Sequence, residues 1–136
     1  MGGQDMGLER FSPQLLSALR IVSALLFIAH GTAKLFQFPA TEMFALAPPV
    51  GDLMWIAGVL EAGGGALLLL GLFTRPVAFV LSGMMAVAYW MAHFPQSPYP
   101  IQNGGDAAIL FCFVFLYIAA AGGGPLGLDS AIGKKK

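Results

Sequence analysis

The sequence predicts an all-α protein: a four-helix transmembrane bundle with an up-down-up-down path and both termini in the cytoplasm. Three observations predict it, namely the composition, four apolar runs separated by turn-forming residues, and the uneven placement of basic residues. Of the 136 residues, 57% are hydrophobic and 10% are charged, and the mean hydropathy is +0.77. Soluble domains carry about 25% charged residues. The rival interpretation, a soluble bundle of four buried helices, would require a polar stripe on each helix, and these runs are apolar nearly all round.

The first helix is expected at residues 14–36. A bilayer core of about 30 Å requires about 20 mostly apolar residues per helix. Ser12 is a suitable N-cap, Pro13 suits the first helical position, and Pro39 ends the run. The polar residues 1–13 before it form a cytoplasmic segment.

The second and third helices are expected at residues 51–73 and 77–93. Pro48 and Pro49 precede the second helix, and glycines at residues 63–65 within it suggest close contact with another helix. The connection at residues 74–76 is very short. These two helices are therefore expected to be antiparallel neighbours.

The fourth helix is expected at residues 106–121. An uncharged, proline-rich loop leads into it, and glycines and a proline at residues 122–125 end it. The four helices make up one membrane domain over residues 14–130. A basic cytoplasmic tail follows at residues 131–136.

The orientation follows from the positions of the basic residues. Arg10, Arg75 and the lysines at residues 134–136 fall on one side, whereas the loops at residues 39–50 and 94–103 contain no Lys or Arg. Cytoplasmic loops carry the excess of basic residues. The sequence therefore predicts a multi-pass protein of the cell inner membrane with cytoplasmic termini, surrounded by the lipid bilayer.

The charge balance and the cysteine content exclude several classes of function. Seven basic and seven acidic residues cancel, and no basic stretch is interleaved with aromatics, so nucleic acid is not an expected partner. Cys112 is the sole cysteine, which excludes an internal disulfide and a Cys-x-x-Cys redox pair. The sequence also has no matched haem-ligand pair and no nucleotide-binding loop. We expect no intrinsic cofactor, so an electron carrier would be a quinone or a partner's group.

Two ionisable residues are expected deep within the bundle. Ionisable groups in membrane helices are costly and usually face the interior. Glu61 falls near the middle of the second helix, and Arg20 on the first is its expected partner. This buried polar pair has two open interpretations: an ion pair that supports helix assembly beside the glycines at residues 63–65, or a proton or substrate site.

A second polar group is expected at the outer ends of the helices. His30 and Lys34 are four residues apart and share one face of the first helix. His93 ends the third helix, and Asn103 and Asp106 flank the start of the fourth. Together they would suit an outer pocket for a polar or anionic head group. The alternative is that they cap helix ends and anchor them at the membrane interface.

The same residues do not predict a metal site. Two histidines and an aspartate could ligate zinc or iron, but no His-x-x-x-His or Glu-x-x-His pair lies on one helix. We therefore expect no metal, and the sequence assigns no catalytic residue.

Several segments, taken in chain order, carry a resemblance to a known family. They are Arg20, HGTAK at residues 30–34, EAGG at residues 61–64, LGLFTR at residues 70–75, NGGD at residues 103–106 and LDS at residues 128–130. Together they resemble the DoxX family of small four-helix membrane proteins, which usually has glutamate where this chain has Asp106. The resemblance implies a cytoplasmic-membrane protein. Relatives include a subunit of a thiosulfate:quinone oxidoreductase and members proposed to join redox or detoxification complexes.

The leading hypothesis is a membrane subunit associated with quinone-linked redox chemistry. Lys34 or His30 would hold a quinone oxygen through a charge-assisted hydrogen bond, and His93 or Asp106 would exchange protons. The alternative is a non-catalytic module that binds a lipid, a small solute or a partner protein, and a third interpretation is a structural assembly subunit. Four short helices bury only a modest core, so a partner subunit or a homo-oligomer is expected.

Overall fold

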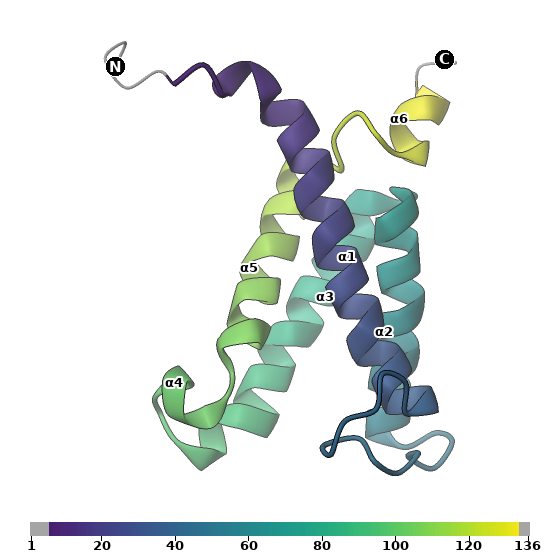
Figure 1. Ribbon diagram of the computed structural model, residues 1–136, viewed down its shortest axis with the longest axis vertical. Coiled ribbons are helices and arrows are strands. Elements are labelled where there is room, and N and C mark those ends of the chain that lie inside the picture. The colour runs from purple at the N-terminus through teal and green to yellow at the C-terminus, as the bar shows by residue number, and fades with distance from the viewer. Residues whose placement is uncertain (1–5, 134–136) are drawn as a thin grey trace.

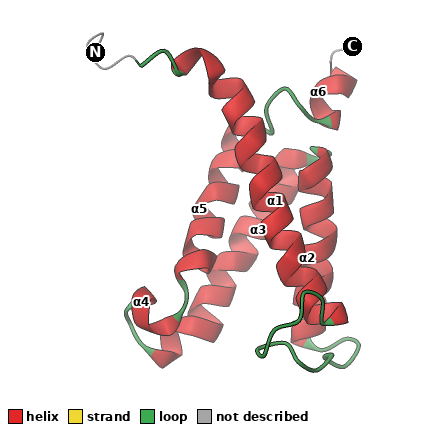
Figure 2. Cartoon of the chain, in the orientation of Figure 1, coloured by secondary structure: helices red, strands yellow, loops and turns green. Residues whose placement is uncertain are grey.

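The computed structural model describes residues 6–133, and all regular structure in that range is helical. Four long helices follow one another in alternating directions, and Figure 1 shows the first and last described residues at the same end of the molecule. Figure 2 shows short helical turns and loops joining them. The long helices are α1 (Ser12–Phe36), α2 (Leu53–Leu70), α3 (Thr74–Ala88) and α5 (Asp106–Ala121). The short elements are 3-10 turns at Glu9–Phe11 and Phe94–Gln96, a π-helical turn at Tyr89–His93, α4 (Pro100–Asn103) and α6 (Leu128–Gly133).

In the first half of the chain, the observed bounds of the two helices differ from the predicted bounds by a few residues. Helix α1 begins at Ser12 rather than residue 14, with Pro13 in its first turn, and ends at Phe36 as expected. Helix α2 spans Leu53–Leu70 and is shorter than the predicted 51–73, because Gly71 adopts φ 70° and ends it. A left-handed residue of this kind commonly terminates a helix, and glycine adopts it without strain.

The third helix begins earlier than predicted and changes character before its end. It starts at Thr74 rather than at residue 77, because Pro76 fits within a first turn, where no intrahelical N–H donor is needed. The α-helix ends at Ala88, and the π-helical turn Tyr89–His93 completes the segment. Helix α5 coincides with the predicted residues 106–121. Of the predicted terminal segments, residues 1–5 and 134–136 lie outside the described range.

Three segments within residues 6–133 are long and apolar enough to cross a membrane. They are Glu9–Phe36, Leu53–Leu70 and Thr74–Gln96, and the apolar helix Asp106–Ala121 is shorter. Sixteen residues at about 1.5 Å each make α5 about 24 Å long, against a hydrocarbon core of about 30 Å.

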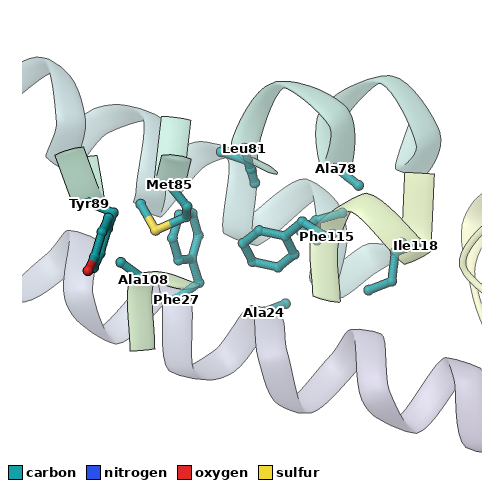
Figure 3. Close-up of a cluster of buried hydrophobic side chains, with 10 residues drawn as sticks. Ala24, Phe27, Ala78, Leu81, Met85, Tyr89, Ala108, Phe115 and Ile118 are labelled. Carbon is teal, nitrogen blue, oxygen red and sulfur yellow. The ribbon is translucent and has the colours of Figure 1, made fainter. Parts of the chain in front are cut away.

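The helices associate as two close pairs that share one apolar core. Helix α1 packs mainly along α2, and α3 along α5. Figure 3 shows Phe27 of α1 and Phe115 of α5 among the buried side chains of the core. Their rings meet edge to face with centroids 5.0 Å apart, a favourable aromatic geometry. This core fixes the two pairs against each other.

Glycines bring α1 and α2 into backbone contact. A Cβ atom on Gly31 would lie 2.5 Å from the backbone nitrogen of Ala62, so no other residue fits there without movement. The predicted contact through residues 63–65 holds only in part. Gly65 faces Ile28 of α1, Gly64 faces α3, and Gly63 faces open space.

Candidate functional site

The centre of the candidate site is an ion pair between α1 and α2. Lys34 Nζ donates to Glu61 Oε1, and the two side chains are only 12% and 3% exposed. The approach depends on small residues, since a Cβ on Gly58 would lie 3.3 Å from Lys34 Cβ and 2.9 Å from a Leu35 carbon. The second carboxylate oxygen, Glu61 Oε2, is buried without a hydrogen-bond partner.

The expected pairing of Arg20 with Glu61 is wrong, because the register of the two helices places them at different depths. Arg20 Nη2 lies 3.5 Å from the carbonyl oxygen of Leu69, which sets its level on α2. Glu61 is eight residues away along that helix, or roughly 12 Å at about 1.5 Å per residue. Lys34, near the C-terminal end of α1, lies at the level of Glu61 instead.

A small cavity lies beside the ion pair. Its volume is about 170 Å³, and Lys34 is the only basic residue in its wall. The Phe44 ring lies beneath the ammonium, with its centroid 5.3 Å from Nζ, a cation–π arrangement. The backbone nitrogen of Phe44 donates to Thr41 Oγ1 at 3.1 Å, which helps hold the loop in place. The other lining residues are Met43, Leu46, Pro48 and Met54.

His30 borders the ion pair but does not bond to it. Its Nδ1 lies 2.8 Å from the carbonyl oxygen of Leu26, one turn earlier on α1. Its ring meets Phe111 of α5 edge-on with centroids 5.9 Å apart. A neutral His30 that donates from Nδ1 leaves Nε2 as an acceptor.

The other residues of the predicted outer pocket form a separate group at the end of the α3–α5 pair. His93 Nδ1 lies 2.9 Å from the carbonyl oxygen of Asn103, and the Asn103 amide donates to Tyr89 Oη at 3.1 Å. Asp106 is exposed at the first position of α5. Among residues 6–133, no hydrogen bond, ion pair or ring contact joins this group to Lys34 or His30. The expected single outer pocket is thus two groups, because the ends of the two helix pairs diverge (Figure 1).

At the opposite end of the molecule, Arg20 joins the first helix to the segment after α5. It is 1% exposed, and its Nη atoms donate to the carbonyl oxygens of Gly123 and Leu126, both at 2.5 Å. Ser17 contributes to the same junction by donating to the Gly123 carbonyl oxygen and accepting from the Leu126 nitrogen. Of the three Arg20 side-chain nitrogens, only Nε has no hydrogen-bond partner. Arg20 thus binds backbone rather than a carboxylate.

Asp129 closes the turn between α2 and α3. Its carboxylate accepts from the backbone nitrogens of Phe73 and Thr74 at 2.9 and 2.8 Å, and its own nitrogen donates to the Gly71 carbonyl oxygen. Burial raises the pKa of Asp129. The hydrogen bonds from Thr74 and Phe73 and the charge of Arg20 outweigh that effect, so the pKa lies below its ordinary 3.8. The sequence motif contained Asp129, but nothing in the sequence shows that it caps a helix 55 residues away.

A cavity of about 590 Å³ lies at the same end of the molecule as Arg20 and Asp129. Its one basic wall residue, Arg75, already donates to the Ala120 carbonyl oxygen at 2.9 Å, and its carboxylate, Asp129, already caps α3. These two charged side chains are bonded to backbone, whereas Thr74 Oγ1, on another residue of the wall, is buried without a hydrogen-bond partner. No three His, Cys, Asp or Glu side chains come together as a metal site anywhere in residues 6–133.

Comparison with known proteins identifies the family. The DoxX family model matches residues 15–94, which is more than half of the chain. The chain belongs to the DoxX family. It is a multi-pass inner membrane protein, as predicted, since its helices are apolar and two relatives are inner membrane proteins.

Three relatives extend over nearly the whole DoxX chain. An uncharacterized protein from Haemophilus influenzae is 46% identical over 132 residues, covering 94% of this chain and 98% of that protein. Inner membrane protein YphA of Escherichia coli is 33% identical over 135 residues, covering 92% and 94%. Inner membrane protein YqjF of Escherichia coli is 26% identical over 125 residues, covering 85% and 90%. No solved structure matches the chain significantly.

The DoxX match covers most of the predicted site residues. Arg20, His30, Lys34, Glu61 and His93 lie inside residues 15–94, whereas Asn103 and Asp106 lie beyond them. The segments that carry the resemblance extend further, from Arg20 to Ser130. The matched part contains α1 to α3 and therefore the Lys34–Glu61 ion pair and its cavity.

Proposed function

We propose that this DoxX protein crosses the inner membrane four times and has both termini in the cytoplasm. Helix α5 is the fourth crossing, supported by its apolar sequence and by its close packing along α3. The orientation is supported by Arg10 and Arg75, which lie at the end of the molecule that holds the first and last described residues. In this arrangement the Lys34–Glu61 pair lies toward the outer face.

The function that the geometry supports best is binding of a quinone head group at Lys34 and Glu61, as part of quinone-linked redox chemistry. The observation that carries the proposal is a paired ammonium in the wall of an apolar cavity of about 170 Å³. Apolar cavities of about 150 Å³ admit one benzene-sized ring. A buried charge in a membrane helix marks a functional site by default.

The two polar groups complement the two redox states of a quinone. Lys34 has three N–H donors, and one that is not used by Glu61 can donate to a quinone carbonyl oxygen. Glu61 Oε2, which has no partner, can accept from a quinol hydroxyl. Reduction of quinone to quinol takes two electrons and two protons, and the electrons would come from a partner subunit. The chain is therefore proposed as the quinone-binding subunit of a larger oxidoreductase.

The test measures quinone bound to the full-length protein in lipid nanodiscs, by mass spectrometry of the released small molecules. The double variant Lys34→Met with Glu61→Leu removes both polar groups while keeping apolar volume, because a buried ion pair can often be replaced by apolar residues without loss of stability. His93→Ala is the matched control in the other outer group. We expect wild type and the control to retain quinone and the double variant to lose most of it.

Two results would contradict the proposal. One is equal retention of quinone by wild type and the double variant, which would show that the pair does not bind it. The other is a phospholipid or another solute in place of quinone that is lost in the double variant, which would favour the non-catalytic binding module instead.

A further inference from the structure

The loop between α1 and α2 exposes an unusual amount of apolar surface. Met43, Leu46 and Val50 are 79%, 86% and 83% exposed, and Phe38 is 74% exposed. The only charged residues in the loop, residues 37–52, are acidic. A contiguous exposed apolar surface of this kind marks a contact with a membrane or a partner.

Two of these exposed side chains also form part of the wall of the Lys34 cavity. Met43 and Leu46 both line that cavity while exposing most of their surface. Met54, in the first turn of α2, completes the wall and is 40% exposed. Apolar side chains that are also exposed on the protein surface therefore separate Lys34 from the exterior of the protein.

Lipid is the occupant that fits this surface. The loop joins the ends of two membrane-spanning helices, so its apolar side chains continue the lipid-facing surface of α2, where Leu53 and Ile56 are 63% and 44% exposed. It carries no Lys or Arg that would hold it at the water side. Apolar faces at the interface lie about 5–10 Å into the boundary between head groups and acyl chains.

We infer that residues 37–52 lie in the outer leaflet and that the Lys34 cavity opens sideways into the bilayer. The ligand then reaches Lys34 dissolved in lipid rather than from the external water. The part that concerns the ligand rests on the proposed quinone site, and the choice of the outer leaflet rests on the proposed orientation. The placement of the loop in lipid rests on neither.

The test uses the full-length protein with one tryptophan as a reporter. Trp55 and Trp90 are replaced by phenylalanine, and Leu46→Trp places the reporter in the cavity wall. Leu26→Trp, exposed on α1, is the control for a lipid-facing site. The protein is reconstituted into phosphatidylcholine vesicles with and without brominated acyl chains, and iodide is added as the quencher in water. Met43→Trp serves as a second reporter if Leu46→Trp does not insert.

We expect the brominated lipid to remove most of the emission of the reporter at residue 46, as it does at residue 26, and iodide to have little effect. Strong quenching by iodide would place the loop in water and overturn the inference. Quenching by neither agent would mean that protein covers the loop, as a second copy or a partner would, and overturns it equally.

The two proposals fail in distinguishable ways. Lipid quenching at residue 46 together with no bound quinone would keep the loop in the leaflet and overturn the quinone site. Bound quinone that depends on Lys34, together with strong iodide quenching at residue 46, would keep the site and overturn access from the bilayer.

Discussion

The buried charged side chains at the two ends of the helix bundle have different kinds of hydrogen-bond partner. At the end near the first and last described residues, Arg20 donates to backbone carbonyl oxygens and Asp129 accepts from backbone nitrogens. At the opposite end, Lys34 and Glu61 bond to each other, one carboxylate oxygen has no partner, and a cavity adjoins the ammonium. Charges that satisfy backbone groups hold a fold together. Charges that keep unused bonding capacity beside a cavity are suited to a ligand.

The largest effect is expected from Arg20→Met. It removes three hydrogen bonds from a charged guanidinium to backbone carbonyl oxygens, each worth about 1.5–3 kcal/mol, so we expect a loss of about 4 kcal/mol or more. The free energy of unfolding is measured by titration with sodium dodecyl sulfate in mixed micelles. A loss below about 1 kcal/mol would show that the stability of the protein does not depend on the Arg20 hydrogen bonds.

The next effect concerns Lys34 and Glu61 themselves. Lys34→Met alone leaves a buried carboxylate unpaired and is expected to cost about 3 kcal/mol, whereas the double variant with Glu61→Leu should return to within about 1 kcal/mol of wild type. The same titration measures all three proteins. If the double variant is as unstable as the single one, the pair is structural, and the contrast between the two ends disappears.

A smaller effect is expected at the close contact between α1 and α2. Gly31→Ala places a Cβ 2.5 Å from the Ala62 nitrogen, so the helices must separate, at a cost of about 2 kcal/mol. Gly63→Ala is the matched control, since its Cβ would meet nothing within 4 Å. Thermal unfolding of the two variants should differ clearly. Equal melting temperatures would rule out a rigid contact at Gly31.

The smallest effect is expected at Asp129. Loss of a capping carboxylate in Asp129→Ala should cost about 1 kcal/mol at neutral pH. Because the pKa of Asp129 is lowered on folding, its contribution is complete above the ordinary value of 3.8 and is lost as pH falls through the folded value. The difference from wild type should therefore shrink in acid. Unfolding curves at pH 7 and pH 3 measure this, and a constant difference would contradict it.

The sequence predicted the helices well and the polar contacts poorly. Apolar length and the positions of proline predicted where α1 and α5 lie, because these are local properties of the chain. Residue type also marked Lys34 and Glu61 as important, since charged groups are costly in lipid. Their partnership was missed because it depends on how far α2 is shifted along α1.

The sequence by itself determined that this protein consists of apolar helices and lies in a membrane. Composition and the length of the hydrophobic runs decide those properties, and neither depends on contacts between helices. Only the tertiary structure decided that Lys34 pairs with Glu61, that Arg20 binds the chain after α5, and that His93 and Asn103 lie in a separate group. The first outcome depends on the register of α1 and α2, which close contacts such as Gly31 against Ala62 hold in place. A shift of α2 along α1 by one helical turn, about 5.4 Å, would separate Glu61 from Lys34.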